Sequence, residues 1–221
     1  MIFTEKKPLD EILASLGEES NIFLLGCNGC AEVCETGGEK TLLAMKAELE
    51  KAGKNVTGTA LVDFLCNKVL VVTRIAPEAD RLKQADSILA LTCGIGVQAV
   101  SAVVDKVVHP AANTVSLGGL QGLWPSDERC QACGNCALDY TGGICPVTSC
   151  AKELLNGPCG GAQDGKCEVD REKDCGWVKI YEHLKKIGRL ENLKQIHGPR
   201  DHSKMLPSSE LRKSPFYDLE R

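Results

Sequence analysis

The sequence predicts an α/β protein: an open, mostly parallel βαβ sheet of the Rossmann or flavodoxin type, then a small cysteine-rich domain, then a C-terminal helix and tail. Short apolar segments alternate with helix-forming segments through the first half of the chain. Eight of the 13 cysteines lie within residues 130–175, and apolar residues at helical spacing follow them. We therefore expect three regions, residues 1–120, 121–176 and 177–221, with the first boundary in the segment GGLQGLWPSDER.

The first region reads as four strands and three helices. The strands are expected at residues 21–26, 56–62, 87–92 and 114–117. The helices are expected at residues 39–52, 77–85 and 97–106. The first helix is the clearest, because Leu42, Leu43, Met45 and Leu49 form an apolar stripe. Strands that alternate with helices are typical of parallel βαβ units, which predicts the open sheet.

The second region contains too little apolar sequence to build a core of its own. Glycine is abundant between Cys130 and Cys175, and only residues 151–155 look like a helical turn. Metal ligation supplies folding free energy directly, so we expect metal to hold this region. The third region begins with apolar residues at helical spacing from Trp177 to Leu193, which predicts one or two amphipathic helices over residues 176–195.

Composition and charge are those of an ordinary soluble protein. The chain has 26 basic and 30 acidic residues, a net charge of −4, which gives no electrostatic reason to expect nucleic-acid binding. The opening MIFTEKKPLDEIL lacks an apolar signal segment, so we expect reduced thiols and a cytoplasmic location. The uncharged stretch from Ser87 to Val104 contains glycines and is interpreted as a strand, a turn and a helix, with no membrane insertion.

Cysteines follow the first three expected strands. Cys27 comes directly after the first strand, Cys66 lies just beyond the second and Cys93 ends the third, while Cys30 and Cys34 follow in the loop and helical turn after Cys27. The carboxyl ends of parallel strands meet at one edge of a sheet, where open α/β folds bind ligands. We expect a four-thiolate [4Fe–4S] cluster here. Single buried cysteines acting as small apolar residues are the alternative.

The segment Gly94–Ala99 partly matches the dinucleotide fingerprint G-x-G-x-x-G/A, but no acidic residue follows about 20 positions later. We expect Gly94 and Gly96 to offer backbone N–H groups to a cofactor, namely the sulfurs of the cluster, or to a partner. Tight strand–helix packing is the alternative.

The spacing of Cys130, Cys133, Cys136 and Cys145, with a proline after the last, is the most specific local motif. It is close to the ferredoxin run C-x₂-C-x₂-C-x₃-C-P with a longer last gap, so we expect a second [4Fe–4S] cluster. Four thiols remain as ligands for a structural zinc ion or as substitutes in that cluster: Cys150, Cys159, Cys167 and Cys175. The histidines at positions 109, 183, 197 and 202 are scattered, and a Cys–His hydrolase has no local support.

The chain also resembles a known family. The segment GGICPVTSCAKELLNGPCGGAQDGKCEV at residues 142–169, with the earlier GCNGCAEVCETGGEK and LTCGIGVQ, is similar to the cysteine-rich C-terminal domain of methylenetetrahydrofolate reductase. In acetogenic and related anaerobic bacteria that domain is a separate small subunit. The similarity covers roughly residues 10–180, and NGPCGG…GKC is its most specific part.

This resemblance implies a cytoplasmic electron-transfer subunit. Its partner would be a flavin-containing catalytic subunit that reduces methylene- to methyl-tetrahydrofolate in the methyl branch of the Wood–Ljungdahl pathway, with a further electron-donor protein as an additional partner. The family is associated with zinc as well as iron–sulfur. Two alternatives therefore stay open: a redox-silent scaffold stabilised by zinc, and a zinc-thiolate methyltransferase.

The hydrophilic tail at residues 198–221 contains prolines and follows the amphipathic stripe, so we expect it to dock the partner. A disordered tail and a helix that only caps the chain's own sheet are the alternatives.

Overall fold

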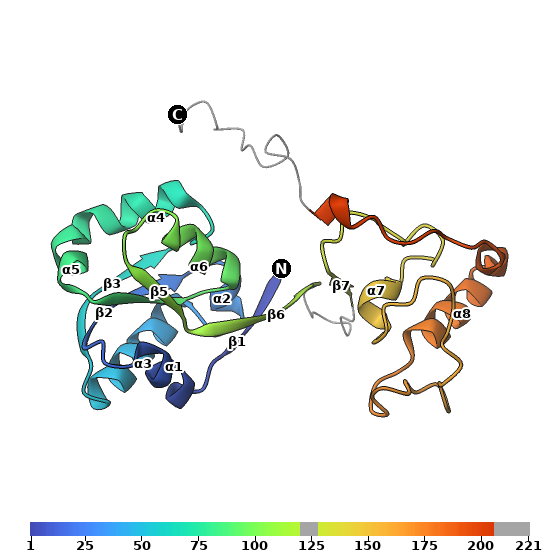
Figure 1. Cartoon of the computed structure of the whole chain (residues 1–221), viewed down its shortest axis with the longest axis horizontal. Helices are drawn as coiled ribbons and strands as arrows, with labels where there is room; N and C mark the ends of the chain where they lie inside the picture. The colour runs from blue at the N-terminus through green and yellow to red at the C-terminus, as the bar shows by residue number, and fades with distance from the viewer. Residues whose placement is uncertain (120–127, 206–221) are drawn as a thin grey trace. The chain divides into compact units, whose positions relative to one another are not determined.

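The computed structural model describes residues 1–119 and 128–205, and these divide into two compact units (Figure 1). Unit 1 comprises Met1–Ser116 and unit 2 comprises Leu117–Arg221. The expected linker residues 120–127 and the last part of the expected docking tail, residues 206–221, lie outside the described residues.

Unit 1 is built on a four-stranded parallel sheet, which confirms the predicted α/β class. Its strands are β2 (Asn21–Cys27), β3 (Asn55–Val62), β4 (Ser87–Leu91) and β5 (Val107–Pro110). The order across the sheet is β3-β2-β4-β5, and all three pairings are parallel. The chain moves outward from β2 first to one side and then to the other, as in doubly wound folds.

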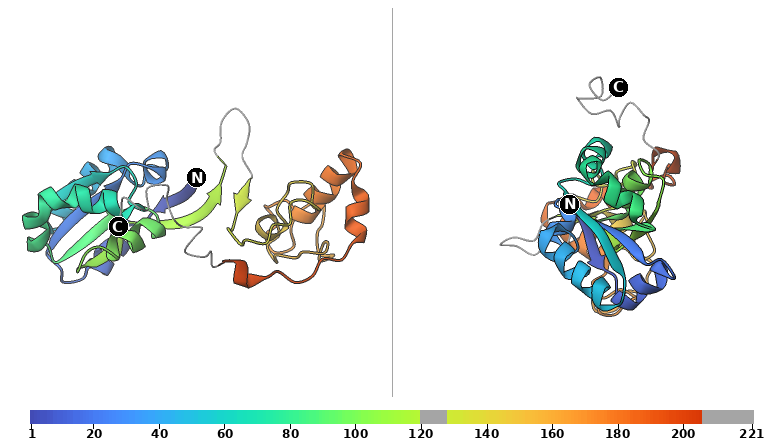
Figure 2. Two further views of the ribbon diagram at one scale, coloured as in Figure 1. Left: turned by 90° about the horizontal axis from the view of Figure 1, so that it is seen from above. Right: turned by 90° about the vertical axis from the view of Figure 1, so that its left-hand side faces the viewer.

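Helices cover both faces of this sheet (Figure 2). The helices of unit 1 are α1 (Leu9–Leu16), α2 (Cys30–Val33), α3 (Gly38–Lys51), α4 (Lys68–Ile75), η1 (Ala76–Glu78), α5 (Ala79–Gln84) and α6 (Gly94–Ser101). Apolar residues of α1 and α3 pack on Ile22 and Leu24, whereas those of α4 and α6 pack on Phe23 and Leu25. Alternate residues of one fully buried strand thus serve two cores, which explains its unbroken apolar sequence.

Some predicted elements of unit 1 were wrong in type or extent. The fourth parallel strand is β5 and not the segment at 114–117, which belongs to β6 (Ala112–Gly118) in a second sheet of order β1-β6-β7. Strand β1 (Ile2–Lys6) and helices α1 and α4 had not been predicted. The helix expected at residues 97–106 is α6, which begins at Gly94 and ends at Ser101.

The uncharged stretch from Ser87 to Val104 forms β4 and α6 with a turn between them, as expected. Within residues 1–119 and 128–205, no helix has the length and apolar character needed to cross a bilayer.

Unit 2 contains few regular elements. They are β7 (Arg129–Cys130), α7 (Pro146–Ser149), α8 (Gly176–Lys186), η2 (Leu190–Lys194) and η3 (His202–Met205). β7 pairs antiparallel with the end of β6. Of the helical turn expected at residues 151–155, a single hydrogen-bonded turn is present, with the N–H of Glu153 donating to the backbone oxygen of Cys150 over 2.9 Å, and the short helix α7 lies just before it.

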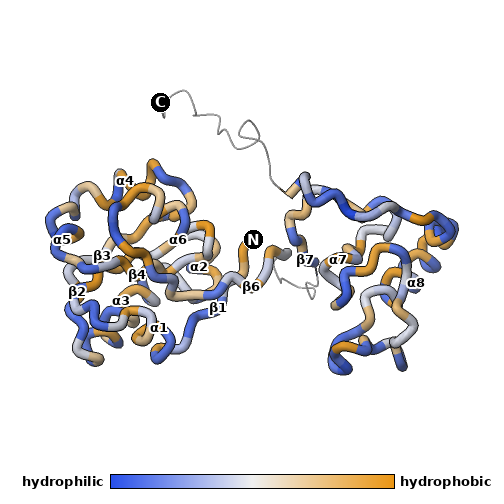
Figure 3. The backbone as a smooth tube through the Cα atoms, viewed as in Figure 1, coloured by the Kyte–Doolittle hydropathy of each residue, from blue (hydrophilic) through white to orange (hydrophobic). Residues whose placement is uncertain are grey.

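The amphipathic stripe of α8 forms the apolar core of unit 2. Trp177, Ile180 and Leu184 are buried and pack against residues of the cysteine-rich loops, including Tyr140 and Ile144. Figure 3 shows hydrophobic and hydrophilic stretches alternating in both units. Helix α8 is therefore packed with the cysteine-rich loops of unit 2, whereas the alternative expected it to cap the sheet.

Candidate metal sites

All thirteen cysteines fall within the described residues, and all are free thiols. Cys27 is the last residue of the central strand β2, and Cys93 caps the N-terminus of α6 directly after β4. β2 and β4 are neighbours, with Gly26 opposite Leu91. Because the chain reverses direction across the sheet at β2, the crevice beyond these strand ends is where doubly wound folds bind ligands.

Cys30 and Cys66 reach the same edge from two loops. Cys66 lies between β3 and α4, immediately before Asn67, whose side chain caps α4 by accepting from the N–H groups of Val69 and Leu70. Cys30 is the first residue of α2.

Gly29 permits the close approach of these two loops. A Cβ atom there would lie 2.9 Å from Cδ1 of Phe64 and 3.0 Å from the backbone oxygen of Asp63. A side chain at this position would separate the loop that carries Cys30 from the loop that carries Cys66.

The pKa of the Cys66 thiol depends on three other thiols at this edge. Burial raises the pKa of the Cys66 thiol, and the neighbouring thiols of Cys27, Cys93 and Cys30 raise it further. A backbone hydrogen bond opposes them and lowers this pKa. Cys27 and Cys93 are each only 7% exposed. Cys30 is half-buried and Cys66 is exposed, so the four soft ligands extend from the buried strand ends to the surface. We call Cys27, Cys30, Cys66 and Cys93 the sheet-edge cysteines.

Cys34 points elsewhere. Its Sγ lies 3.8 Å from the backbone oxygen of Ile2, toward which the thiol donates. The sequence left Cys30 and Cys34 as equal candidates for the fourth ligand, and the structure brings only Cys30 to the other three.

The two glycines at the start of α6 differ in their surroundings. The N–H of Gly94 donates to Oγ1 of Thr114 over 2.8 Å, so that amide already has a partner. A Cβ on Gly96 would lie 2.4 Å from Oγ1 of Thr92. This geometry favours tight strand–helix packing over an N–H group offered to a cofactor. Thr114 itself was missed by the sequence analysis, because nothing local marks it.

The ferredoxin-like run occupies a loop of unit 2 and the start of α7. The N–H of Ala132 donates to Sγ of Cys130 over 3.3 Å, as in loops that wrap a thiolate-bound metal. Ala132 and Gly134 both have positive φ, 53° and 71°, which curls the backbone around Cys133. Cys136 is exposed and Cys145 caps α7. Burial is the largest cause that raises the pKa of Tyr140, and the charges of Asp139 and then Cys145 raise it further.

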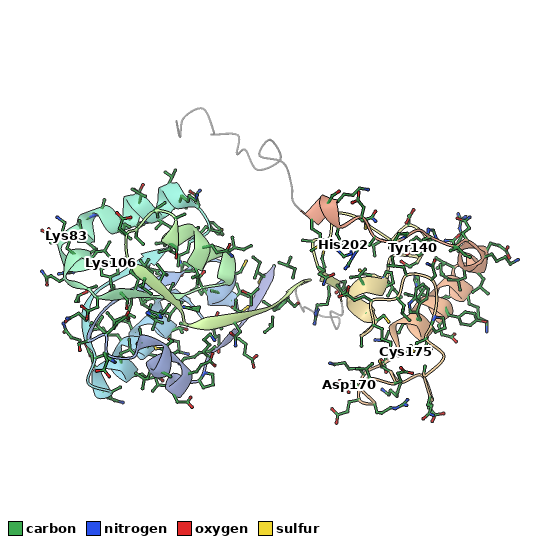
Figure 4. All side chains as sticks on the ribbon, viewed as in Figure 1. Lys83, Lys106, Tyr140, Asp170, Cys175 and His202 are labelled. Carbon is green, nitrogen blue, oxygen red and sulfur yellow. The ribbon has the colours of Figure 1, made fainter. Side chains whose placement is uncertain are left out.

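The four remaining thiols line one small cavity of about 10 Å³. We call these residues the cavity cysteines: Cys150, Cys159, Cys167 and Cys175. The cavity volume suits a single small occupant. Backbone N–H groups of Val169, Asp170 and Ala151 lower the pKa of Cys167, although partial burial opposes them. A thiolate stabilised by backbone donors is a good metal ligand. Figure 4 labels Cys175, which caps the N-terminus of α8.

As the side chains lie, no group of three or more His, Cys, Asp and Glu residues in the described part of the chain is arranged to hold a metal ion. Four sulfurs bound to one zinc ion at about 2.3 Å stand about 3.8 Å apart, and a cluster holds its ligands farther apart because it lies between them. The donor chemistry of the sheet-edge and cavity cysteines fits thiolate-bound metal.

Residues 109–203 match a protein family described as "Methylene-tetrahydrofolate reductase C terminal". The matched segment is less than half of the chain and contains every cysteine from Cys130 to Cys175. The early motifs around Cys27 and Cys93 lie outside it. No curated protein and no solved structure matches the chain. The expected relationship to the C-terminal domain of methylenetetrahydrofolate reductase is therefore confirmed for this segment, and it indicates a role related to that enzyme.

Proposed function

We propose that the chain is the iron–sulfur electron-transfer subunit of a methylenetetrahydrofolate reductase complex. The observation that carries the proposal is the placement of four thiols, from three separate segments of the chain, at the carboxyl edge of the parallel sheet. The family match of unit 2 supplies the link to methylenetetrahydrofolate reduction.

The sheet-edge cysteines would hold the first [4Fe–4S] cluster, and Cys130, Cys133, Cys136 and Cys145 would hold the second. Such clusters supply one-electron oxidation and reduction. The protein contributes position and environment: Cys27 and Cys93 are buried at rigid strand ends, and the N–H of Ala132 bonds the sulfur of Cys130. Burial and N–H···S bonds are the means by which a protein tunes such a centre.

A structural zinc ion at the cavity cysteines is a second candidate, favoured by one observation. The cavity among Cys150, Cys159, Cys167 and Cys175 is only about 10 Å³, which suits one ion better than a cluster. Four thiolates are a common ligand set for structural zinc. A zinc ion here would tie α7, the following loops and α8 together without taking part in redox chemistry.

The chemical step would take place on a flavin-containing partner, with this chain passing electrons to it. We expect the isolated chain to accept electrons from a chemical reductant but not to reduce methylene-tetrahydrofolate. Addition of the flavoprotein should give turnover. Turnover by the single purified chain would overturn the assignment as an accessory subunit, and zinc-dependent methyl transfer without a flavoprotein would favour a methyltransferase.

Docking of the partner through the C-terminal tail is tested best by a short deletion. Arg200 donates to Gln131 and forms an ion pair with Glu153, so removal of residues 198–221 would also remove contacts within unit 2. Deletion of residues 206–221 leaves those contacts in place. We expect the shorter deletion to weaken copurification with the flavoprotein at unchanged iron content. Unaltered affinity would exclude these residues as a docking arm.

A further inference from the structure

Four large apolar residues with exposed side chains lie within three residues of a sheet-edge cysteine along the chain. We call them the edge patch: Val33, Phe64, Val69 and Ile95. Their exposed fractions are 63%, 53%, 45% and 52%, in that order. They come from α2, the loop after β3, and the first turns of α4 and α6, which Figure 1 labels. Unit 1 has eight large apolar residues as exposed as these, so half of them flank one site.

Two observations bring the segments of the edge patch together. Ring atoms of Phe64 lie 2.9 and 3.1 Å from the position that a Cβ of Gly29 would take, so the ring lies against the loop that carries Cys30. The thiol of Cys66 is close enough to those of Cys30 and Cys93 for their charges to act on it. The edge patch therefore flanks the thiols at the carboxyl end of the sheet. Apolar surface with a polar rim marks a site of interaction with another molecule.

The rim of the edge patch is mostly acidic. The charged residues of the three segments at 27–35, 63–69 and 93–97 are all exposed, and they are Glu32, Glu35, Asp63 and Lys68. None of them forms an ion pair within the part of the chain that the structure describes. A partner that presents lysine or arginine side chains around an apolar surface would complement this rim.

The small size of the edge patch and its charged rim favour a temporary contact. Permanent subunit interfaces bury large and strongly apolar surfaces, whereas electron-transfer partners meet over small surfaces and separate again. Attraction between opposite charges speeds such encounters. A redox partner that covers the edge patch would also bring its own redox centre close to the sheet-edge cysteines.

We propose that the edge patch is the docking surface for a transient electron-donor protein whose redox centre is surrounded by basic side chains. This inference rests on the proposed function, because it places the entry of electrons at the cluster that the sheet-edge cysteines would hold. The donor passes one electron to the oxidised cluster, so its own centre is oxidised as the cluster is reduced. The flavoprotein, as a permanent partner, uses a different surface.

Cytochrome c is the probe for this surface, since lysine side chains surround its exposed haem edge. The full chain, purified anaerobically, is reduced with dithionite, freed of excess reductant and mixed with ferricytochrome c in a stopped-flow instrument. One electron passes from a reduced cluster to each haem iron, which changes from ferric to ferrous. We expect fast transfer at low salt that slows at least about tenfold between about 10 and 300 mM NaCl. Plant plastocyanin, which docks through an acidic face, should react more slowly and should not be slowed by salt.

Two matched pairs of variants localise the docking. Val33→Lys should lower the second-order rate constant with cytochrome c about tenfold at low salt, whereas Val107→Lys should leave it unchanged. Val107 is 55% exposed and is the first residue of β5, at the opposite end of the sheet. Glu32→Gln should lower the rate constant about two- to threefold. Glu18→Gln should not, because Glu18 is exposed in the loop before β2, also at the opposite end.

Iron content and bleaching are measured for every variant, which separates this inference from the proposed function. A wild-type chain without iron would overturn both. Iron-containing chains with equal rate constants within each pair would contradict docking at the edge patch and leave the proposed function intact. The same holds if Val33→Lys abolishes self-association, or copurification with the flavoprotein, at an unchanged rate constant. The edge patch would then belong to a second copy of the chain or to the permanent partner.

Discussion

Replacement of the two glycines at the start of α6 by alanine should have opposite effects on stability. Neither glycine has a left-handed backbone, so alanine is sterically allowed by φ at both positions. A Cβ on Gly94 would meet its nearest atom, Oγ1 of Thr114, at 3.5 Å, which is ordinary contact. A Cβ on Gly96 would lie 2.4 Å from Oγ1 and 2.7 Å from Cγ2 of Thr92, which is 1% exposed.

The expected difference in stability between the two variants follows from two contributions, helix propensity and overpacking. Alanine is favoured over glycine in a helix by up to about 1 kcal/mol, and both variants share this gain. Only Gly96→Ala adds overpacking, which costs about 1–3 kcal/mol because Thr92 has little room to move. The free energies of unfolding of the two variants should therefore differ by about 1–3 kcal/mol, with Gly94→Ala the more stable.

Urea unfolding of the full chain, followed by far-UV circular dichroism, measures this difference under identical metal loading. Gly94→Ala is the matched control, since it lies in the same helical turn. Equal unfolding midpoints would refute the packing role of Gly96. A large loss of stability in Gly94→Ala would instead show that Gly94 has a structural role that its packing does not explain.

Two further predictions concern the cysteines of α2 and the acid stability of unit 1. Cys30→Ser should lower the iron content of the chain by one cluster, roughly four iron atoms, whereas Cys34→Ser should leave the iron content unchanged. Equal losses of iron in the two variants would contradict the assignment of Cys30 as a ligand. Backbone N–H groups of Asn21 and Ser20 donate to the carboxylate of Asp86 and lower its pKa in the folded state. The charged carboxylate therefore stabilises the folded state at any pH above its pKa in the unfolded chain, which is about 4. This stabilisation is lost as the pH falls through the lower pKa of the folded state. Asp86→Asn should therefore be less stable than the wild type at pH 7, with the difference shrinking below about pH 4 in acid unfolding, and a constant difference would refute the linkage.

The parallel sheet was predictable where apolar runs were long. β2 and β4 are buried along almost their whole length and read as unbroken apolar strands. β5 has only four residues, VVHP, and was missed because so short a segment carries no periodicity. α4 has the sequence KVLVVTRI, whose β-branched residues favour a strand. Burial of Val71 and Ile75 against the sheet overrides that propensity.

The capping signal for α4 was present in the sequence. Asn67 precedes the helix and accepts from two backbone N–H groups, so an N-cap search would have located its start. The segment at 114–117 was recognised as a strand, but its pairing depends on β1 and β7, which are distant in the sequence.

Topology explains why the sheet-edge cysteines could be grouped from the sequence, whereas the other cysteines were grouped by spacing alone. Once β2, β3 and β4 are parallel, cysteines at their carboxyl ends must share one edge of the sheet. The choice between Cys30 and Cys34 required the direction of each side chain at the start and just beyond the end of the short helix α2. In unit 2 no sheet constrains the loops, so Cys150 and Cys175 were grouped only as thiols left over from the ferredoxin-like run, and the structure places both in the lining of one cavity.

The central claim is that these thiols hold iron–sulfur clusters, and the metal and sulfide content of the full chain, purified without oxygen, tests it most directly. Two [4Fe–4S] clusters require about eight iron and eight sulfide ions per chain. We predict that content, a visible absorption that bleaches on reduction, and about one zinc ion if the cavity cysteines bind one. A chain that holds zinc alone, without iron or sulfide, would contradict the electron-transfer account and leave a zinc-stabilised scaffold in its place.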